Sequence, residues 1–262
     1  MVTGVDNAIG MQAVGLLASR GGEVRVFVQQ ADEDPDRSEE LAAGYRRRGC
    51  KVALGQLDDE AHVETAFEQV HTVLHLLGRP SDDPDRYLEH TATVVGAAIG
   101  AGCRRMVLLS DLAVSSPLDN PWLDALAQAE DLVADAPLES LVLRCAVIHG
   151  SDDLLTSSLA AGVLGAKPQG AHWPVAATDV ARTAVLADAE RDLDTNLHVV
   201  VPLTGPLRLS TASFASQLAA GVPTQSVAPL PVHAMELMNR VIERPDDALG
   251  LHGATVQQAW SV

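Results

Sequence analysis

Two polar residues in the middle of the chain, Asp111 and His149, could carry out acid/base chemistry. Each follows an apolar run that is typical of a buried strand, residues 106–109 and residues 138–148. Ligands of open α/β sheets bind at the carboxyl ends of the strands, so a carboxylate and an imidazole there could exchange protons with a bound molecule. We predict Asp111 and His149 as acid/base partners. The alternatives are a helix or loop cap for Asp111 and a structural hydrogen bond for His149.

A second group of candidates forms a glycine-containing turn near the start of the chain, Thr3-Gly4-Val5-Asp6-Asn7-Ala8-Ile9-Gly10. Such a turn between a strand and a helix lets backbone N–H groups and the helix dipole hold a pyrophosphate. Gly4 and Gly10 occupy the positions that shape the turn and allow close packing. Asn7 replaces the glycine that admits the phosphates, so we expect its side chain to project toward them and Asp6 to repel them.

The elements that must position these residues alternate regularly. Short apolar runs, such as residues 23–28 and 72–77, alternate with segments of helical period, such as residues 87–102 and 121–134. This gives about six strand–helix repeats. The pattern predicts an α/β protein with a Rossmann-type, doubly wound parallel sheet covered by helices on both faces.

The regular alternation of strands and helices ends after residue 150. Residues 151–174 read as a loop rich in Gly, Ala and Ser, and helices are expected at residues 179–188, 211–220 and 233–244. We expect residues 1–150 to form a nucleotide-binding-like core and residues 151–262 a small C-terminal lobe. Residues 176–201, which include an expected strand at 197–201, should return to the core, so that the chain forms one structural unit.

The motifs, taken in order, resemble those of the extended and atypical short-chain dehydrogenase/reductase superfamily, which includes NmrA-like and NAD-dependent epimerase/dehydratase-like proteins. Thr3, Gly4 and Gly10 match its TGxxGxxG turn. The remaining matches, which continue to about residue 205, are Gly55-Gln56-Leu57 to GDL, His75-Leu76-Leu77-Gly78 to HLAG, residues 107–110 to a strand ending in Ser-Ser, residues 143–150 to LRPxxVYG, and residues 175–181 to VxVxDVA.

The resemblance fails at the positions that carry the family's chemistry. Alignment on Glu130 places Trp122 at the catalytic Tyr and Leu126 at the catalytic Lys, while Asp111 falls on the catalytic Ser/Thr. A Tyr with a pKa of about 10 can donate a proton near pH 7 only if a neighbouring cation lowers that pKa. Trp has no usable acid proton and Leu has no charge. We therefore expect no redox activity that depends on a Tyr and a Lys.

The cofactor positions depart as well. Families that bind NAD place an acid at the end of the second strand, and families that bind NADP place an Arg there. This chain has Gln29 and Gln30, which select neither. We expect NAD or NADP to bind weakly or not at all. If one binds, the resemblance implies contacts at Gly4, Asn7, Ile9, Gly10, Gln29 and Gly78.

The composition argues against several kinds of partner. A net charge of −17 disfavours nucleic acids and anionic membranes. Three Cys without a CxxC pair, and His residues without HExxH-like spacing, predict neither a disulfide framework nor a metal site. We find no signal peptide or long apolar stretch and expect a cytoplasmic, bacterial protein. Only Met1 and Val2 precede Thr3, so we leave open whether the natural chain begins upstream.

Three functions remain open at this point. The first is a divergent NAD(P)-binding-fold protein that acts as a regulatory or partner-binding protein. The second is a non-redox enzyme, a cyclase, dehydratase or isomerase, that uses Asp111 and His149. The third is an NAD(P)H reductase that works without the Tyr, in a bacterial secondary-metabolite pathway. The partner is accordingly a small-molecule ligand or another protein, and the oligomeric state is undetermined.

Overall fold

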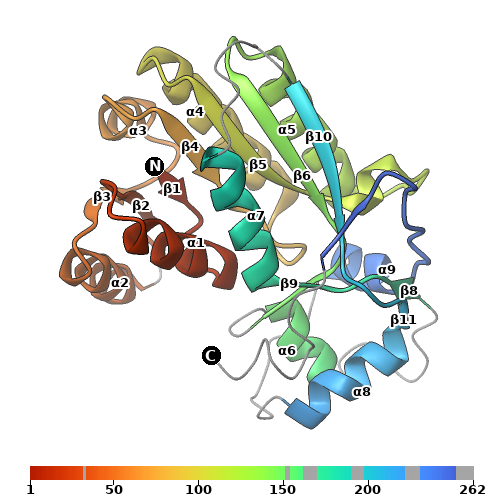
Figure 1. Ribbon diagram of the computed structural model, residues 1–262. Coiled ribbons are helices and arrows are strands. Elements are labelled where there is room, and N and C mark those ends of the chain that lie inside the picture. The colour runs from red at the N-terminus through yellow and green to blue at the C-terminus, as the bar shows by residue number, and fades with distance from the viewer. Residues whose placement is uncertain (32–33, 151–153, 162–169, 190–197, 222–230, 252–262) are drawn as a thin grey trace.

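A parallel sheet runs through the middle of the molecule (Figure 1). The computed structural model describes residues 1–31, 34–150, 154–161, 170–189, 198–221 and 231–251. Within these residues the sheet has eight strands in the order β12-β10-β6-β5-β4-β1-β2-β3, and every adjacent pair is parallel. The strands are β1 (Val2–Thr3), β2 (Arg25–Gln29), β3 (Lys51–Gly55), β4 (Thr72–His75), β5 (Arg105–Asp111), β6 (Glu139–Cys145), β10 (His198–Thr204) and β12 (Leu249–Gly250).

The first five α-helices each begin behind an Asn or Asp whose side chain accepts a hydrogen bond from the first turn of the helix. Such a cap satisfies a backbone N–H that would otherwise have no partner in the helix. A Pro in the first turn of α2, α4 and α5 adds a backbone angle that suits a helix start. The helices are α1 (Ala8–Ser19), α2 (Pro35–Arg47), α3 (Glu60–Phe67), α4 (Pro84–Gly100) and α5 (Pro121–Asp135).

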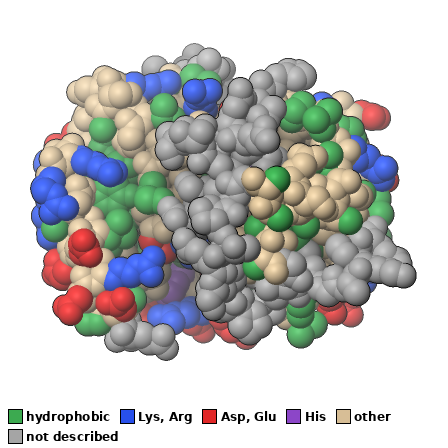
Figure 2. All heavy atoms as spheres, turned by 90° about the horizontal axis from the view of Figure 1, so that it is seen from below, with side chains coloured by type: hydrophobic (Ala, Val, Ile, Leu, Met, Phe, Trp, Pro, Cys, Tyr) green, Lys and Arg blue, Asp and Glu red, His purple; other side chains and the backbone are tan. Residues whose placement is uncertain are grey.

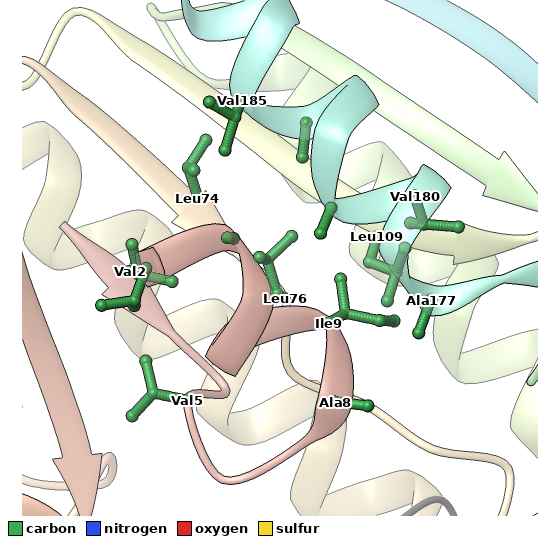
Figure 3. Packing of buried hydrophobic residues seen from close by; sticks show 14 of the residues in the cluster. Val2, Val5, Ala8, Ile9, Leu74, Leu76, Leu109, Ala177, Val180 and Val185 are labelled. Atoms are coloured by element: carbon green, nitrogen blue, oxygen red, sulfur yellow. The ribbon is translucent and has the colours of Figure 1, made fainter. Parts of the chain in front are cut away.

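Helices cover both faces of the sheet (Figure 1). On one face, α1 and α2 lie with α7 (Ala177–Ala189); on the other lie α3, α4 and α5. Figure 3 shows how the first face is packed: Ile9 of α1 and Val180 of α7 meet over Leu76 and Leu109 at the ends of the central strands. Burying these side chains removes apolar surface from water, which is the main free-energy gain in folding. The predicted Rossmann-type fold is confirmed.

Three elements that follow residue 150 belong to the sheet and the helices that cover it: α7, β10 and β12. α7 packs beside α1, and β10 pairs with β6 along six residues, from His198 opposite Ser140 to Leu203 opposite Cys145. The chain thus returns to the sheet after the lobe begins.

The small lobe contains α6 (Leu154–Ala160), α8 (Thr211–Gly221) and α9 (Val232–Met238), with a core of Leu159, Phe214, Leu218, Ala234 and Met238. Four short strands complete the description: β7 (Ile148–His149), β8 (Ala171–His172), β9 (Val175–Ala176) and β11 (Leu209–Ser210).

Two predictions in this region are wrong. The stretch 151–174, expected to be a loop, contains α6 and the short strand β8, although its residues 151–153 and 162–169 lie outside the described part of the chain. The helix expected at residues 233–244 ends at Met238, because Arg240 and Ile242 exchange backbone hydrogen bonds with Ala171.

No helix in the described ranges is long and apolar enough to cross a membrane. Figure 2 views the molecule from the end that carries α6 and α8. On that face, basic side chains lie next to acidic ones with hydrophobic side chains between them. Among the described residues on this face, acidic side chains therefore do not form one uniform patch.

Candidate active site

A groove lies at the carboxyl edge of the sheet, beside β1 and β4. These two strands are neighbours, and from them the chain runs outward in opposite directions, to β2 on one side and to β5 on the other. Open α/β sheets bind their ligands at this kind of reversal. Two pockets meet here and share Asn7, Leu77, Gly78 and Arg79: a polar pocket of about 530 Å³ and an apolar pocket of about 80 Å³.

Gly4 and Gly10 shape the turn that enters the groove. Gly4 has a φ of +72°, and a Cβ there would lie 2.4 Å from the carbonyl oxygen of Leu76. A Cβ on Gly10 would lie 2.1 Å from the carbonyl oxygen of Gly4. Both residues must be glycine for the turn to pack against the strands. Neither lines the two pockets.

Asn7 does not have the orientation that the sequence suggested. Its backbone is extended, with a φ of −111°, and the residue is 8% exposed. Nδ2 donates to the carbonyl oxygen of Leu76 at 2.7 Å, and Oδ1 accepts from the backbone N–H of Gly10 at 2.9 Å. The prediction that this side chain projects toward the phosphates is wrong, because both of its polar atoms are bonded within the protein. Asn7 nevertheless borders both pockets.

Asp6 lies beside a cation. Arg79 Nη2 donates to Asp6 Oδ2 at 2.8 Å and to the Asp6 carbonyl oxygen at 3.2 Å. Asp6, which we expect from the sequence to repel the phosphates, is thus paired with a cation in this structure. The sequence reasoning missed Arg79, although its position directly after the HLAG-like motif could have indicated it.

The polar pocket lies at the end of β2. Gln29 and Gln30 line it together with Arg79, Arg86 and His90. Its side chains offer amide, guanidinium and imidazole groups, together with the carboxylates of Asp6, Asp82 and Asp83. The amide, guanidinium and imidazole groups suit a ligand with hydroxyl and phosphate groups. The pocket thus has the polar character that the ribose and phosphate part of a dinucleotide requires.

Gly78 lies between the two pockets with a φ of +106°. A Cβ at this position would come within 2.6 Å of the Tyr87 ring and 3.3 Å of the Trp122 ring. A side chain here would be strained by its backbone and blocked by both rings. A glycine at position 78 therefore lets both rings pack against the loop that borders the two pockets.

The apolar pocket contains Asp111 at the end of β5. Asp111 Oδ1 accepts a 2.7 Å hydrogen bond from the backbone N–H of Ala113 and thereby caps the short helix η1 (Leu112–Ser115). Burial raises the pKa of Asp111 to about 6, although this hydrogen bond opposes the rise. Cys145, its partner across the strands, has a thiol whose pKa burial also raises, so it stays protonated. Asp111 is therefore both a helix cap and a buried carboxyl group whose pKa is raised toward neutral pH.

Trp122 and Leu126 of α5 form one wall of this pocket, as does Ile9 of α1. Trp122 is 2% exposed, and its ring centroid lies 4.9 Å from that of Tyr87. Tyr87 was not singled out from the sequence. Burial raises the pKa of its hydroxyl, so this tyrosine is a poor acid near neutral pH. None of these aromatic and aliphatic side chains can donate a proton near neutral pH.

His149 does not line either pocket, although its neighbours Ile148 and Gly150 line the apolar one. Its ring packs edge-on against Phe214 of the lobe, with 5.8 Å between the ring centroids. Burial lowers its pKa to about 4, and its buried Nδ1 has no hydrogen-bond partner among the residues that the structure describes. The structure therefore does not join His149 to Asp111 as an acid/base pair, since the β7 backbone turns its side chain toward the lobe.

A buried ionic cluster holds α5 against the strands that end in the pocket. Arg144 of β6 donates from Nε and Nη2 to both carboxylate oxygens of Glu130, at distances from 2.5 to 3.1 Å. Ser110 Oγ donates to Glu130 Oε1 at 2.5 Å. These charge-assisted bonds fix the helix that carries Trp122 and Leu126. Glu130, on which the family motif was aligned, thus holds α5 in place without lining either pocket.

The groove fits a dinucleotide in outline. The polar pocket at Gln29 and Arg79 adjoins the apolar pocket at Asp111, and Gly78 borders both. The polar pocket corresponds to the ribose and phosphate half of a dinucleotide, and the apolar pocket to the half that carries the nicotinamide ring. Among the described residues, no group of three or more His, Cys, Asp or Glu side chains could hold a metal ion.

Known proteins agree with this architecture. A family model described as NAD(P)H-binding matches residues 4–189. The chain is 30% identical over 176 residues to a 3-diazoavenalumate denitrifying reductase from a Streptomyces species, covering 57% of the chain and 56% of that protein. It is 32% identical over 117 residues to a (4-alkanoyl-5-oxo-2,5-dihydrofuran-3-yl)methyl phosphate reductase from Streptomyces griseus, covering 45% of the chain and 36% of that protein. The matches thus span little more than half of the first relative's length and about a third of the second's.

The fold is also similar to that of a dTDP-glucose 4,6-dehydratase from Streptomyces venezuelae, solved with NAD bound. The TM-score is 0.67 at 19% identity, and the match covers 84% of this chain and 80% of that one. At this identity the likeness shows the fold alone. Because the family model matches more than half of the chain, the protein belongs to the NAD(P)H-binding family, within the superfamily that its ordered motifs resemble.

Proposed function

We propose that this protein is an NAD(P)H-dependent reductase that uses Asp111, rather than a tyrosine, as its acid. The observation that carries the proposal is the position of Asp111: it lies at the carboxyl end of β5, in the apolar pocket that continues into the polar one. Its pKa, raised to about 6, leaves a usable fraction of the carboxyl group protonated at neutral pH.

The chain's own residues would divide the work as follows. Gln29 and Arg79 would hold the polar half of the cofactor, and the apolar walls at Ile9 and Leu126 would exclude water from the reacting groups. A bound reduced nicotinamide supplies a hydride ion. Asp111 would donate a proton to the atom adjacent to the one that accepts the hydride, and would later regain that proton from solvent. Hydride and proton together complete a two-electron reduction.

The lining of the apolar pocket favours one kind of substrate. Between Trp122 and Asp111, beside the nicotinamide ring, its apolar walls suit a small planar group with a polarised double bond better than a nucleotide sugar. The reductase names of the two Streptomyces relatives support this choice of reaction. The non-redox alternative relied on His149 as the partner of Asp111, and that partnership is not present in the groove.

Thermal unfolding with millimolar NAD, NADH, NADP or NADPH at equal ionic strength tests the proposal. A ligand present at a hundred times its Kd adds about 2.7 kcal/mol of stability. For a chain of this size that corresponds to a rise in Tm of roughly 5–10 °C. We expect a rise of this order with at least one reduced cofactor. No rise with any of the four would overturn the reductase proposal and return attention to a partner-binding role.

A further inference from the structure

Arg79 and Asp6 face each other from the two loops that flank the groove. Asp6 belongs to the turn between β1 and α1, and Arg79 to the loop between β4 and α4. Two hydrogen bonds, at 2.8 and 3.2 Å, join the guanidinium of Arg79 to the carboxylate and carbonyl oxygens of Asp6. Arg79 borders both pockets, so its charge lies next to any ligand that occupies the two pockets together.

The backbone at Arg79 is fixed, whereas its side chain can be reached from solvent. The backbone N–H of Arg79 donates to Asp82 Oδ2 at 2.9 Å, and the N–H of Asp82 donates back to the Arg79 carbonyl oxygen at 2.9 Å. The Arg79 side chain is 29% exposed and that of Asp6 is 55% exposed. Ion pairs this exposed contribute little stability, so a competing anion could displace Asp6 at small cost.

The β1–α1 turn needs such a cation. In a glycine-rich turn, backbone N–H groups at the helix start meet the pyrophosphate. Here Asn7 Oδ1 already accepts the N–H of Gly10, so that donor is taken. A guanidinium pairs with phosphate oxygens through two parallel hydrogen bonds and keeps its charge at every physiological pH. Arg79 lies next to this turn and can supply both the charge and the donors.

We propose that Arg79 binds the pyrophosphate of the dinucleotide and that Asp6 competes with the pyrophosphate for the same guanidinium. The inference rests on the proposed reductase function and names the residue that compensates for the missing glycine. Asp6 then lowers the affinity for the cofactor, and Arg79 raises it. Because every nicotinamide dinucleotide contains the pyrophosphate, Arg79 should act on NADH and NADPH alike.

The test is the Kd of NADH and of NADPH, measured by calorimetry as a function of salt concentration. For Arg79→Gln we expect the Kd of both cofactors to rise about tenfold or more. The Kd should also depend less on salt concentration, because one phosphate contact is lost. For Asp6→Asn we expect severalfold tighter binding of both. Arg46→Gln is the matched control for Arg79, since Arg46 makes an exposed ion pair with Glu39 on α2 outside the groove. Arg46→Gln should bind NADH and NADPH with the same Kd as the wild-type protein.

Asp83→Asn controls for simple loss of negative charge. Asp83 also lines the polar pocket, and asparagine can keep its cap on α4, so this variant should tighten binding less than Asp6→Asn does. Equal tightening would overturn the competition between Asp6 and the pyrophosphate. If Arg79→Gln weakens only NADPH, Arg79 contacts the 2′-phosphate and the inference is wrong.

If the wild-type protein binds a cofactor and Arg79→Gln binds it with the same Kd, the inference about Arg79 is wrong, whereas the reductase proposal still holds. Failure of the wild-type protein to bind either cofactor would overturn both. Melting curves without cofactor establish that each variant is folded. Asp6→Asn leaves Arg79 in place and so tests the inference independently.

Discussion

The side-chain amide nitrogen of Asn7 lies 2.7 Å from the carbonyl oxygen of Leu76, and this hydrogen bond joins the β1–α1 turn to the end of β4. The other amide atom caps α1 through the N–H of Gly10. One side chain thus connects the two loops between which a cofactor would lie. It stabilises the turn at the position where a glycine would give the phosphates closer access.

Replacing Asn7 should therefore cost stability. We expect Asn7→Ala to lower the free energy of unfolding by about 2 kcal/mol, since it removes a helix cap and leaves the buried Leu76 oxygen without this donor. Asn7→Asp is the control, because it keeps the capping oxygen but loses the donor, and it should be intermediate at low salt. Denaturant unfolding measures both. Equal stability of wild type and Asn7→Ala would show that these bonds add nothing.

Asp111 should destabilise the protein at neutral pH. Its pKa is about 6 in the folded protein against an ordinary value of 3.8, so the folded state binds the proton more tightly. The protein then loses stability as the pH rises from about 4 to about 6, and the penalty is fully present above that window.

Asp111→Asn removes the charge and keeps an oxygen for the N–H of Ala113. It should raise the free energy of unfolding by on the order of 2 kcal/mol at pH 7.5 and by much less at pH 4. It should also abolish the reductase activity while leaving cofactor binding in place. Unchanged turnover in Asp111→Asn would remove Asp111 as the acid.

His149 should make the protein sensitive to acid. Burial lowers its pKa to about 4 from an ordinary 6.5, so the unfolded state binds more protons between these values. The contribution of neutral His149 is present above pH 6.5 and is lost as the pH falls toward 4. His149→Leu should therefore unfold less readily than wild type near pH 4.5, by on the order of 2 kcal/mol, with cofactor affinity and turnover unchanged. A large loss of turnover at neutral pH would restore a catalytic role for His149.

The Glu130–Arg144 pair should be strongly coupled. Removing one partner leaves the other charge partly buried without its counterion, so we expect Glu130→Gln to lose roughly 2–4 kcal/mol of unfolding free energy. The double variant Glu130→Leu with Arg144→Met should recover much of this loss. Glu39→Gln, which breaks an exposed pair, should change stability by less than about 1 kcal/mol. Additive effects in a double-mutant cycle at Glu130 and Arg144 would contradict the coupling.

The order of the elements could be read from the sequence, because the period of the apolar residues depends only on local geometry. Runs around residues 72–77 and 106–109 identified two central strands, and Gly4 and Gly10 identified the turn between the first strand and α1. The ends of elements were less predictable. β5 continues to Asp111, and α9 stops at Met238, because hydrogen bonds with distant segments set those limits.

The sequence by itself thus determined the fold class, the family and the location of the groove, since these follow from hydrophobic period and from motifs in a fixed order. It also placed Asp111 at the carboxyl end of β5. Tertiary structure alone decided the direction of each polar side chain. Asn7 turns inward to Leu76, His149 turns to Phe214, and Arg79 reaches Asp6, because the partner in each case lies more than sixty residues away along the chain. Contacts at such separations leave no periodic signal near either residue.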